Sequence, residues 1–179
     1  SSMRGLLEAL ASQAGALIAR VQAEEALRRS EAKFRELYES SADGIASVDM
    51  QGMVIDCNPA FLRLVGYSRE EVRQKTFRDL TPPEWREAEE RILREQVLVR
   101  GYSDLYEKSY RRADGAVVPI ELRTWLKRDA EGTPIGMWAI VHDISLRKKA
   151  ERDVAELRRQ IDLVLASTKT NIDIIDREF

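Results

Sequence analysis

The apolar residues at the N-terminal end of the chain recur at helical spacing. No proline interrupts residues 3–39, and the apolar positions step by three and four, as in a coiled-coil seam: Leu7, Leu10, Ala14, Leu17 and Val21. The stripe changes phase at Leu27 and continues through Phe34 and Leu37, and such a shift alters supercoil winding locally. The pattern fits one amphipathic helix packed on its own domain, or a parallel dimer helix that becomes a domain-capping helix near Leu27. We favour the second interpretation.

A second helical pattern begins at Leu146. Its apolar residues follow a heptad seam: Ala150, Val154, Leu157, Ile161 and Val164. Charged residues fill the other faces. Because so short a coiled coil is marginal in isolation, the pairing of this helix needs support from other contacts.

The middle of the chain, from about Ser41 to Ser145, has the alternation of strands. Two apolar stretches flank a tight turn, and three more follow with turns between them: residues 45–49, 53–57, 105–112, 117–126 and 135–141. Start signals for short helices occur at Asn58, Ser68 and Thr81. The third helix should be longer, with these residues on its apolar side: Trp85, Ala88, Ile92 and Val99. We predict an α+β domain with one five-stranded antiparallel sheet and a long coiled-coil helix at each end.

Composition narrows the function. Charged residues make up 34% of the chain but nearly cancel, to a net charge of −2, which argues against electrostatic binding to nucleic acid or to an anionic membrane. No apolar run approaches the roughly 18 residues of a membrane span. One cysteine excludes an internal disulfide framework and fits a reducing compartment. We expect a cytoplasmic location, with any membrane anchor of the parent protein elsewhere.

Five short motifs occur in a defined order: Ala42-Asp43-Gly44-Ile45, Asn58-Pro59-Ala60-Phe61, residues 66–71, Arg112-Ala113-Asp114-Gly115 and Asp143-Ile144-Ser145. Together they resemble a PAS domain with its C-terminal PAC segment. The resemblance implies the PAS fold over residues 31–145, with short helices on one face of the sheet. It also implies a ligand- or signal-sensing domain of a multidomain protein, often a sensor histidine kinase, although the parent could instead be a cyclic-dinucleotide enzyme. No catalytic residue is expected in this segment.

The flanking helices are expected to join further domains. Residues 1–30 resemble the final helix of a GAF domain, and residues 146–165 would form a coiled-coil linker. Residues 167–176 can be aligned with residues 40–49, and both segments would end as an apolar strand closing with aspartate. Residues 166–179 are therefore predicted to open a second PAS domain, with chance similarity over a short window as the alternative.

The resemblance also implies which sheet face looks into a cavity, because strand residues alternate between faces. The side chains expected to line it are Tyr106, Lys108, Tyr110, Ile120, Leu122, Met137, Ala139, Val141, Phe61, Leu64, Phe77, Leu80, Trp85 and Ile92. Thr124 should point inward as well. These side chains either fill a core or surround an unknown small molecule. Lys108 would need a route to solvent or an anionic partner, either a bound carboxylate or a neighbour such as Asp104 or Glu107.

The outer face of the sheet carries apolar side chains that need a cover: Trp125, Trp138 and Ile140. An antiparallel sheet usually leaves one face to water. The incoming helix offers three candidates for the cover, from the same chain or from a partner chain: Phe34, Leu37 and Tyr38. This face is a physical reason to expect a homodimer.

Residue types argue against the common cofactors. Blue-light PAS relatives carry an adduct-forming cysteine where this chain has Phe77, and Cys57 is expected to be a buried small hydrophobe. Haem needs an axial ligand, and the single histidine, His142, is predicted to lie on the outer face. The chain also lacks the several His or Cys residues of a metal site.

The polar joint between the last strand and the C-terminal helix, Asp143 to Glu151, is the expected point of signal coupling. Asp143 or Ser145 can cap the helix, and Asp143 can hold Arg147 or a residue of the incoming helix. A change in the sheet would then alter the helix seam and bias an output domain through a population shift. The alternative is a ligand-free dimerising spacer between neighbouring sensor domains.

Overall fold

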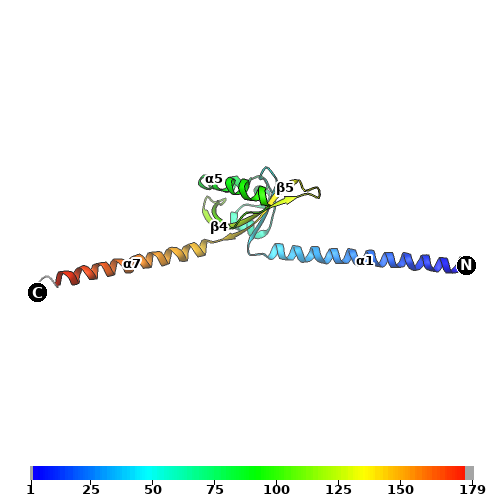
Figure 1. Cartoon of the computed structure of the whole chain (residues 1–179), viewed down its shortest axis with the longest axis horizontal. Helices are drawn as coiled ribbons and strands as arrows, with labels where there is room; N and C mark the ends of the chain where they lie inside the picture. Colours follow the sequence, from blue (N-terminus) through cyan, green and yellow to red (C-terminus); the bar gives the residue numbers. More distant parts are fainter. Residues whose placement is uncertain (1, 176–179) are drawn as a thin grey trace.

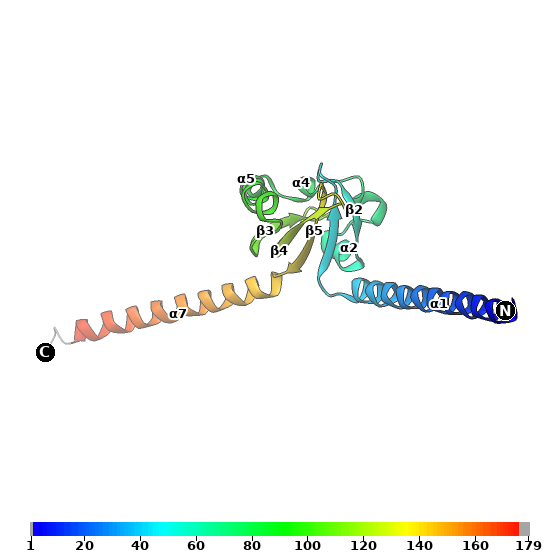
Figure 2. The same ribbon diagram turned by 45° about the vertical axis from the view of Figure 1, so that its right-hand side comes forward.

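In the computed structural model, which describes residues 2–175, two long helices flank a small α+β domain (Figure 1). Helix α1 spans Ser2–Ser40 and helix α7 spans Ser145–Ile175. Both leave the same edge of the domain and run away from it in opposite directions (Figure 2). The predicted fold class is confirmed, with a long helix on each side of one five-stranded antiparallel sheet. No helix within residues 2–175 combines the length and the apolar character that crossing a membrane requires.

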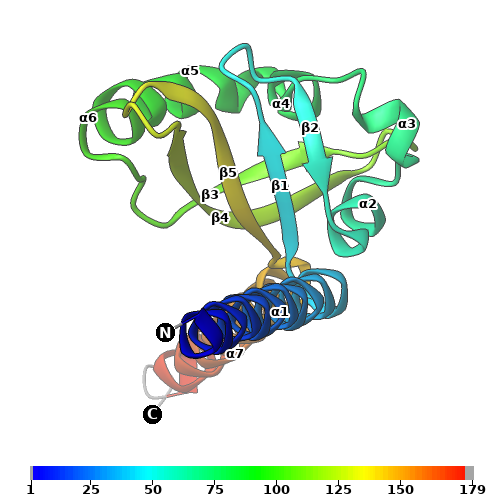
Figure 3. The same ribbon diagram turned by 90° about the vertical axis from the view of Figure 1, so that its right-hand side faces the viewer.

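The sheet brings the first and last strands together. Its strands are β1 (Gly44–Val48), β2 (Val54–Cys57), β3 (Tyr106–Arg111), β4 (Val117–Arg128) and β5 (Pro134–Asp143). They lie in the order β2-β1-β5-β4-β3, and all neighbouring pairs are antiparallel. Because Gly44 of β1 faces Val141 of β5, the start of β1 lies beside the end of β5. The end of α1 and the start of α7 therefore meet at one edge of the domain (Figure 3).

Short helices cover the inner face of the sheet. They are α2 (Pro59–Val65), α3 (Arg69–Val72), α4 (Phe77–Leu80), α5 (Pro83–Ile92), the π-helical turn η1 (Leu93–Val97) and α6 (Leu98–Arg100). Asn58 and Ser68 cap α2 and α3 as predicted. Thr81 is not the cap of α5, which has no side-chain cap, and the cap with Asp79 is made instead by Thr76 on α4.

The longest of these helices buries a different side from the one predicted. The predicted apolar side included Val99, which is exposed, whereas Glu89, Leu93 and Val97 face inward. The wider i→i+5 turn departs from the regular helical period on which the prediction relied. The expected apolar side is therefore wrong at Val99.

The inner face of the sheet packs against these helices as strand alternation predicts. Ile120, Leu122 and Thr124 of β4 are buried, while Arg123 is exposed. Met137 and Val141 of β5 are also buried, as is Cys57 at the end of β2. The core therefore lies between one sheet face and α2–α5, and the other face of the sheet is left without helices (Figure 3).

The C-terminal segment differs from the expectation drawn from the internal alignment. Helix α7 continues to Ile175, so the strand expected there is wrong for residues 171–175, and Asp176 lies outside the described residues. A strand needs a neighbour for its backbone N–H and C=O groups, whereas a helix pairs these groups internally. All five strands that the structure describes belong to the one sheet, which ends at Asp143.

Candidate functional site

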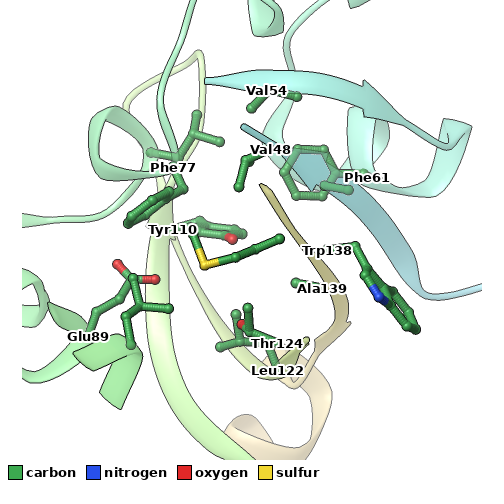
Figure 4. Close-up of a pocket in the computed structure, with 14 residues that line it drawn as sticks. Val48, Val54, Phe61, Phe77, Glu89, Tyr110, Leu122, Thr124, Trp138 and Ala139 are labelled. Atoms are coloured by element: carbon green, nitrogen blue, oxygen red, sulfur yellow. The ribbon is translucent and has the colours of Figure 1, made fainter. Parts of the chain in front are cut away.

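A small cavity lies between the inner face of the sheet and the helices (Figure 4). The space open to water-sized molecules is about 40 Å³. Since one water needs roughly 10–15 Å³ on this measure, the cavity holds about three. The residues predicted as lining that do surround it are Phe61, Phe77, Leu80, Tyr110, Leu122, Met137 and Ala139.

Other residues predicted as lining lie outside the cavity wall: Leu64, Trp85, Ile92, Tyr106, Lys108, Ile120 and Val141. Ile120 and Val141 are buried nearer the α7 end of their strands, where the helices pack directly on the sheet. Leu93, one helical turn after Glu89, lines the cavity instead of Ile92. The ammonium group of Lys108 is bound by other side chains.

The sequence prediction missed one further wall, one acid and Trp138, which was expected only on the outer face of the sheet but is among the residues that line the cavity. Ala46, Val48 and Val54 line the cavity from β1 and β2, and the alternation along these strands could have revealed them. Glu89 was missed because a glutamate on a helix is expected to face water. It is only 5% exposed and forms one end of the cavity (Figure 4).

Lys108 and Glu89 form a buried ion pair. Lys108 is 2% exposed, and its Nζ donates to Glu89 Oε1 and to Thr81 Oγ1, the latter at 2.8 Å. Nζ also lies 4.6 Å from the centroid of the Tyr110 ring. Burial lowers the pKa of Lys108, and the Glu89 carboxylate opposes that shift. The pair is therefore satisfied within the chain.

Asp104 and Glu107, the acids that the sequence offered as ion-pair partners for Lys108, do not pair with it. Asp104 pairs with Arg100 at 2.6 Å. Glu107 follows Tyr106 and precedes Lys108 on β3, so strand alternation places it on the opposite face of the sheet. Neither acid is the partner of Lys108, and that expectation is wrong.

The outer face of the sheet keeps its aromatic surface open. Trp125 and Trp138 stack with ring centroids 4.3 Å apart, and Trp138 is 36% exposed. Phe34 and Leu37 of the same chain do not cover them, since these side chains are 69% and 62% exposed. The expected cover from the same chain is wrong, because α1 leaves the domain instead of crossing the sheet (Figure 3).

Asn58 fixes the departure of α1. Its side-chain amide donates to the carbonyl oxygens of Tyr38 and Asp43, at 3.0 and 2.9 Å. Its Oδ1 accepts from the backbone N–H groups of Ile45 and Phe61, both at 2.9 Å. Asn58 is fully buried. One side chain thus joins the end of α1, the start of β1 and the helix that carries Phe61 to the cavity.

The start of α7 is held by the polar residues that we name the α7 junction: Glu107, Glu121, Asp143, Arg147 and Lys148. Asp143 Oδ1 accepts from the backbone N–H of Ser145 at 2.8 Å. Arg147 Nη2 binds Glu107 at 2.8 Å and Glu121 at 2.9 Å, and Lys148 Nζ binds Glu107 at 2.6 Å. The expected Asp143–Arg147 contact is therefore wrong, because acids on β3 and β4 lie under Arg147.

Hydrogen bonds at the α7 junction shift the pKa values of its charged side chains. A hydrogen bond from Lys148 lowers the pKa of Glu107, and a hydrogen bond to Glu121 raises the pKa of Arg147. Beside the junction, His142 Nδ1 pairs with Asp43, which lies between α1 and β1. His142 is exposed on the outer face, as predicted. The two long helices are thus tied to the same edge of the sheet through separate polar contacts.

The central unit is one α+β domain in which a sheet and short helices enclose a small cavity, with one long helix entering and one leaving at a single edge. The chain belongs to the PAS fold family, whose profile matches residues 32–144. Relatives with this segment are sensor proteins and signalling enzymes, and the chain serves as a sensory signal-transduction module.

Two curated relatives illustrate the similarity. A probable diguanylate cyclase of Escherichia coli, DgcE, is 34% identical over 139 residues, which is 76% of this chain and 12% of that protein. The sensor histidine kinase TmoS of Ectopseudomonas mendocina is 29% identical over 140 residues, 78% of this chain and 14% of that protein. The chain therefore spans a small part of the relatives that it matches.

Solved structures share the fold. A PAS domain from Colwellia psychrerythraea superposes with a TM-score of 0.60 at 24% identity, covering 64% of this chain and 96% of that domain. This likeness concerns the fold of the central domain.

Proposed function

We propose that this module relays the state of its cavity, or of an upstream domain, to α7 through the α7 junction. One observation carries the proposal: neighbouring residues of β3 and β4 face the two sides of the sheet. Lys108 lies inside and Glu107 outside, while Leu122 lines the cavity and Glu121 holds Arg147. A shift of either strand therefore moves a residue of the inner layer and an anchor of α7 together.

The route from α1 has its own contacts. Asn58 joins the Tyr38 carbonyl to the backbone of Phe61, whose side chain lines the cavity. A displacement of α1 thus acts on the cavity wall through one buried side chain. The two routes let either a ligand or an upstream domain bias the same sheet, in the sense of a population shift.

A homodimer supports such a relay. The seam of α7 is exposed at Val154, Leu157 and Ile161, and Trp138, which stacks on the half-buried Trp125, is exposed as well. Exposed apolar surface of this kind is typical of interaction sites. A second copy offers a matching apolar helix with Phe34 and Leu37, so we assign the cover of the outer face to the partner chain.

The parent protein is proposed to be a multidomain sensor with a histidine kinase as its output, or a cyclic-dinucleotide enzyme in its place. Residues 1–30 would end a GAF-like domain, and residues 166–179 would be the start of a second PAS domain. The location of this segment would be the cytoplasm. These assignments draw on the signalling enzymes among the relatives, of which the chain spans only a part.

The relay is tested in the full-length parent by changing Glu107 and Glu121 together to Gln. These substitutions keep the side-chain size and remove the charges that hold Arg147. We expect output activity to lose its dependence on the input, while the matched variant Glu131→Gln, on the exposed turn before β5, keeps it. A normal response in the double variant contradicts the relay.

The second candidate is a ligand-free dimerising spacer, favoured by the small volume of the cavity. Native mass spectrometry of the purified chain separates the two. A retained or titratable small molecule supports sensing at the cavity, whereas a dimer that stays empty across a metabolite set supports the spacer.

A further inference from the structure

The Glu89 carboxylate at the polar end of the cavity has hydrogen-bond acceptor positions that the chain does not fill. A carboxylate offers about four lone-pair positions. Glu89 Oε1 accepts from Lys108, and Glu89 Oε2 lies 3.1 Å from Thr81 Oγ1. The single hydroxyl proton of Thr81 is shared with a second acceptor, the Phe77 carbonyl oxygen at 2.8 Å. Glu89 therefore remains open to a further donor from the cavity that it lines.

A second polar group near this carboxylate is not fully satisfied. Within residues 2–175, the buried hydroxyl of Tyr106 makes no hydrogen bond of good geometry, although Glu89 and Thr124 lie close to it. Burial, and then the Glu89 carboxylate, raise the pKa of this phenol, so it stays protonated. Buried polar groups are nearly always hydrogen-bonded, so the polar side chains around Glu89 have not used all of their hydrogen-bonding capacity.

The charge of this region is balanced without a ligand. Glu89 is the one acidic or basic residue among the side chains that surround the cavity in the described part of the chain, and Lys108 neutralises it. An added carboxylate would lose its water and meet Glu89, while the nearby ammonium of Lys108 is already paired. The remaining wall is mostly apolar, with Val48, Leu122 and Met137 among its members.

We propose that the cavity takes a small, uncharged hydrogen-bond donor, such as a primary amide or an alcohol of a few non-hydrogen atoms, and rejects carboxylates of the same shape. The donor would bind Glu89 and the carbon part would pack on the apolar wall. The inference deepens the proposed function, since it names the ligand class for the cavity that the relay would read.

Acetamide and acetate test the proposal, because they share size and shape and differ in charge. Binding is followed by NMR titration of the purified chain, from the shifts of Leu122, Thr124 and the Met137 methyl group. We expect acetamide to bind the wild-type protein with a dissociation constant at least tenfold below that of acetate. Equal or tighter binding of acetate overturns the proposal, and so does a failure of both probes to move these signals.

Glu89→Gln should reverse the order of affinity for acetamide and acetate. The variant leaves the ammonium of Lys108 without its carboxylate. At a pH low enough for Lys108 to keep its proton, acetate becomes its partner and the order of the two probes should invert by at least tenfold. The matched control is Glu87→Gln, on the exposed side of the same helix, which should keep the wild-type order. A variant that still prefers acetamide contradicts the assigned role of the pair. The wild-type comparison stands even where the variant folds poorly.

The outcome is separable from that of the relay. Rejection of both probes removes the ligand class, while the Glu107 and Glu121 variants still report whether the sheet controls the output.

Discussion

The ion pair between Lys108 and Glu89 leads to a quantitative prediction for Glu89→Gln. This change leaves an ammonium group on a side chain that is 2% exposed. The folded protein must either keep the buried charge or release its proton. Releasing the proton at pH 7 costs about 1.36 kcal/mol for each pH unit up to the ordinary lysine pKa of about 10.4, or about 4.6 kcal/mol. Loss of one partner of a buried pair costs about 3–5 kcal/mol, in agreement with that ceiling.

The sign of the pH dependence follows from the same reasoning. In Glu89→Gln the folded-state pKa of Lys108 loses the support of the carboxylate and falls further below its unfolded value. The unfolded chain then binds more protons than the folded one, so the stability of the variant rises with pH until the unfolded lysine also deprotonates. Its deficit relative to the wild type should therefore shrink between pH 7 and pH 10.

Urea unfolding followed by tryptophan fluorescence measures both quantities. The double variant Glu89→Leu with Lys108→Met removes both charges and should be more stable than the sum of the single changes allows, since buried pairs can be replaced by apolar groups of similar size. A loss below about 1 kcal/mol in Glu89→Gln, or additive single effects, refutes the assignment of a dry, coupled pair.

Three further predictions concern the contacts around the sheet. Asn58→Ala removes the side-chain partner of the buried N–H of Phe61 and of partly buried backbone groups at Tyr38, Asp43 and Ile45. At about 1–3 kcal/mol for a buried group, it should destabilise the domain by at least about 2 kcal/mol in urea unfolding. The control Gln74→Ala, which truncates another amide side chain at an exposed position, should change little. The lowered pKa of Glu107 stabilises the folded state above the unfolded pKa of about 4.3, and this stability is lost as the pH falls through the folded-state pKa. Unfolding of Glu107→Gln should therefore show a smaller loss of stability between pH 7 and pH 3 than unfolding of the wild type. Trp138→Glu should shift sedimentation from dimer to monomer while the monomer stays folded, and an unchanged dimer would remove the outer face from the interface.

Local sequence signals predicted the turns and the starts of the short helices. The glycine turns separate the strands where expected: Gly52 and Gly115 both adopt a positive φ, which glycine tolerates without steric strain. Asn58 before Pro59 marks the start of α2. These features depend on residues close in sequence, so a single chain reveals them.

The contacts of the candidate site join residues that are far apart in sequence. Glu89 and Lys108 are 19 positions apart and meet only because α5 packs over β3. Leu93 lines the cavity one helical turn after Glu89, on a side of the helix that the apolar pattern did not mark. Arg147 likewise finds Glu121 on β4 instead of the nearer Asp143. Packing of separate elements decided these pairs, and no local pattern carries that information.

The direction of α1 could not be predicted from the sequence pattern either. Its apolar stripe suggested a cover for Trp125 and Trp138, but the stripe only says that the helix has an apolar side. Hydrogen bonds from Asn58 to the Tyr38 carbonyl and from the Tyr38 hydroxyl to Asp56 hold the end of the helix at the edge of the domain.

Hydrogen exchange at the start of α7 tests the relay most directly. The measurement compares residues 145–151 in the wild type and in Leu122→Ala, which enlarges the cavity next to Glu121. The same comparison is then made in a chain that carries Glu107→Gln and Glu121→Gln. The relay predicts that Leu122→Ala alters exchange in this segment only while both glutamates are present. An equal change in both backgrounds, or none in either, contradicts it.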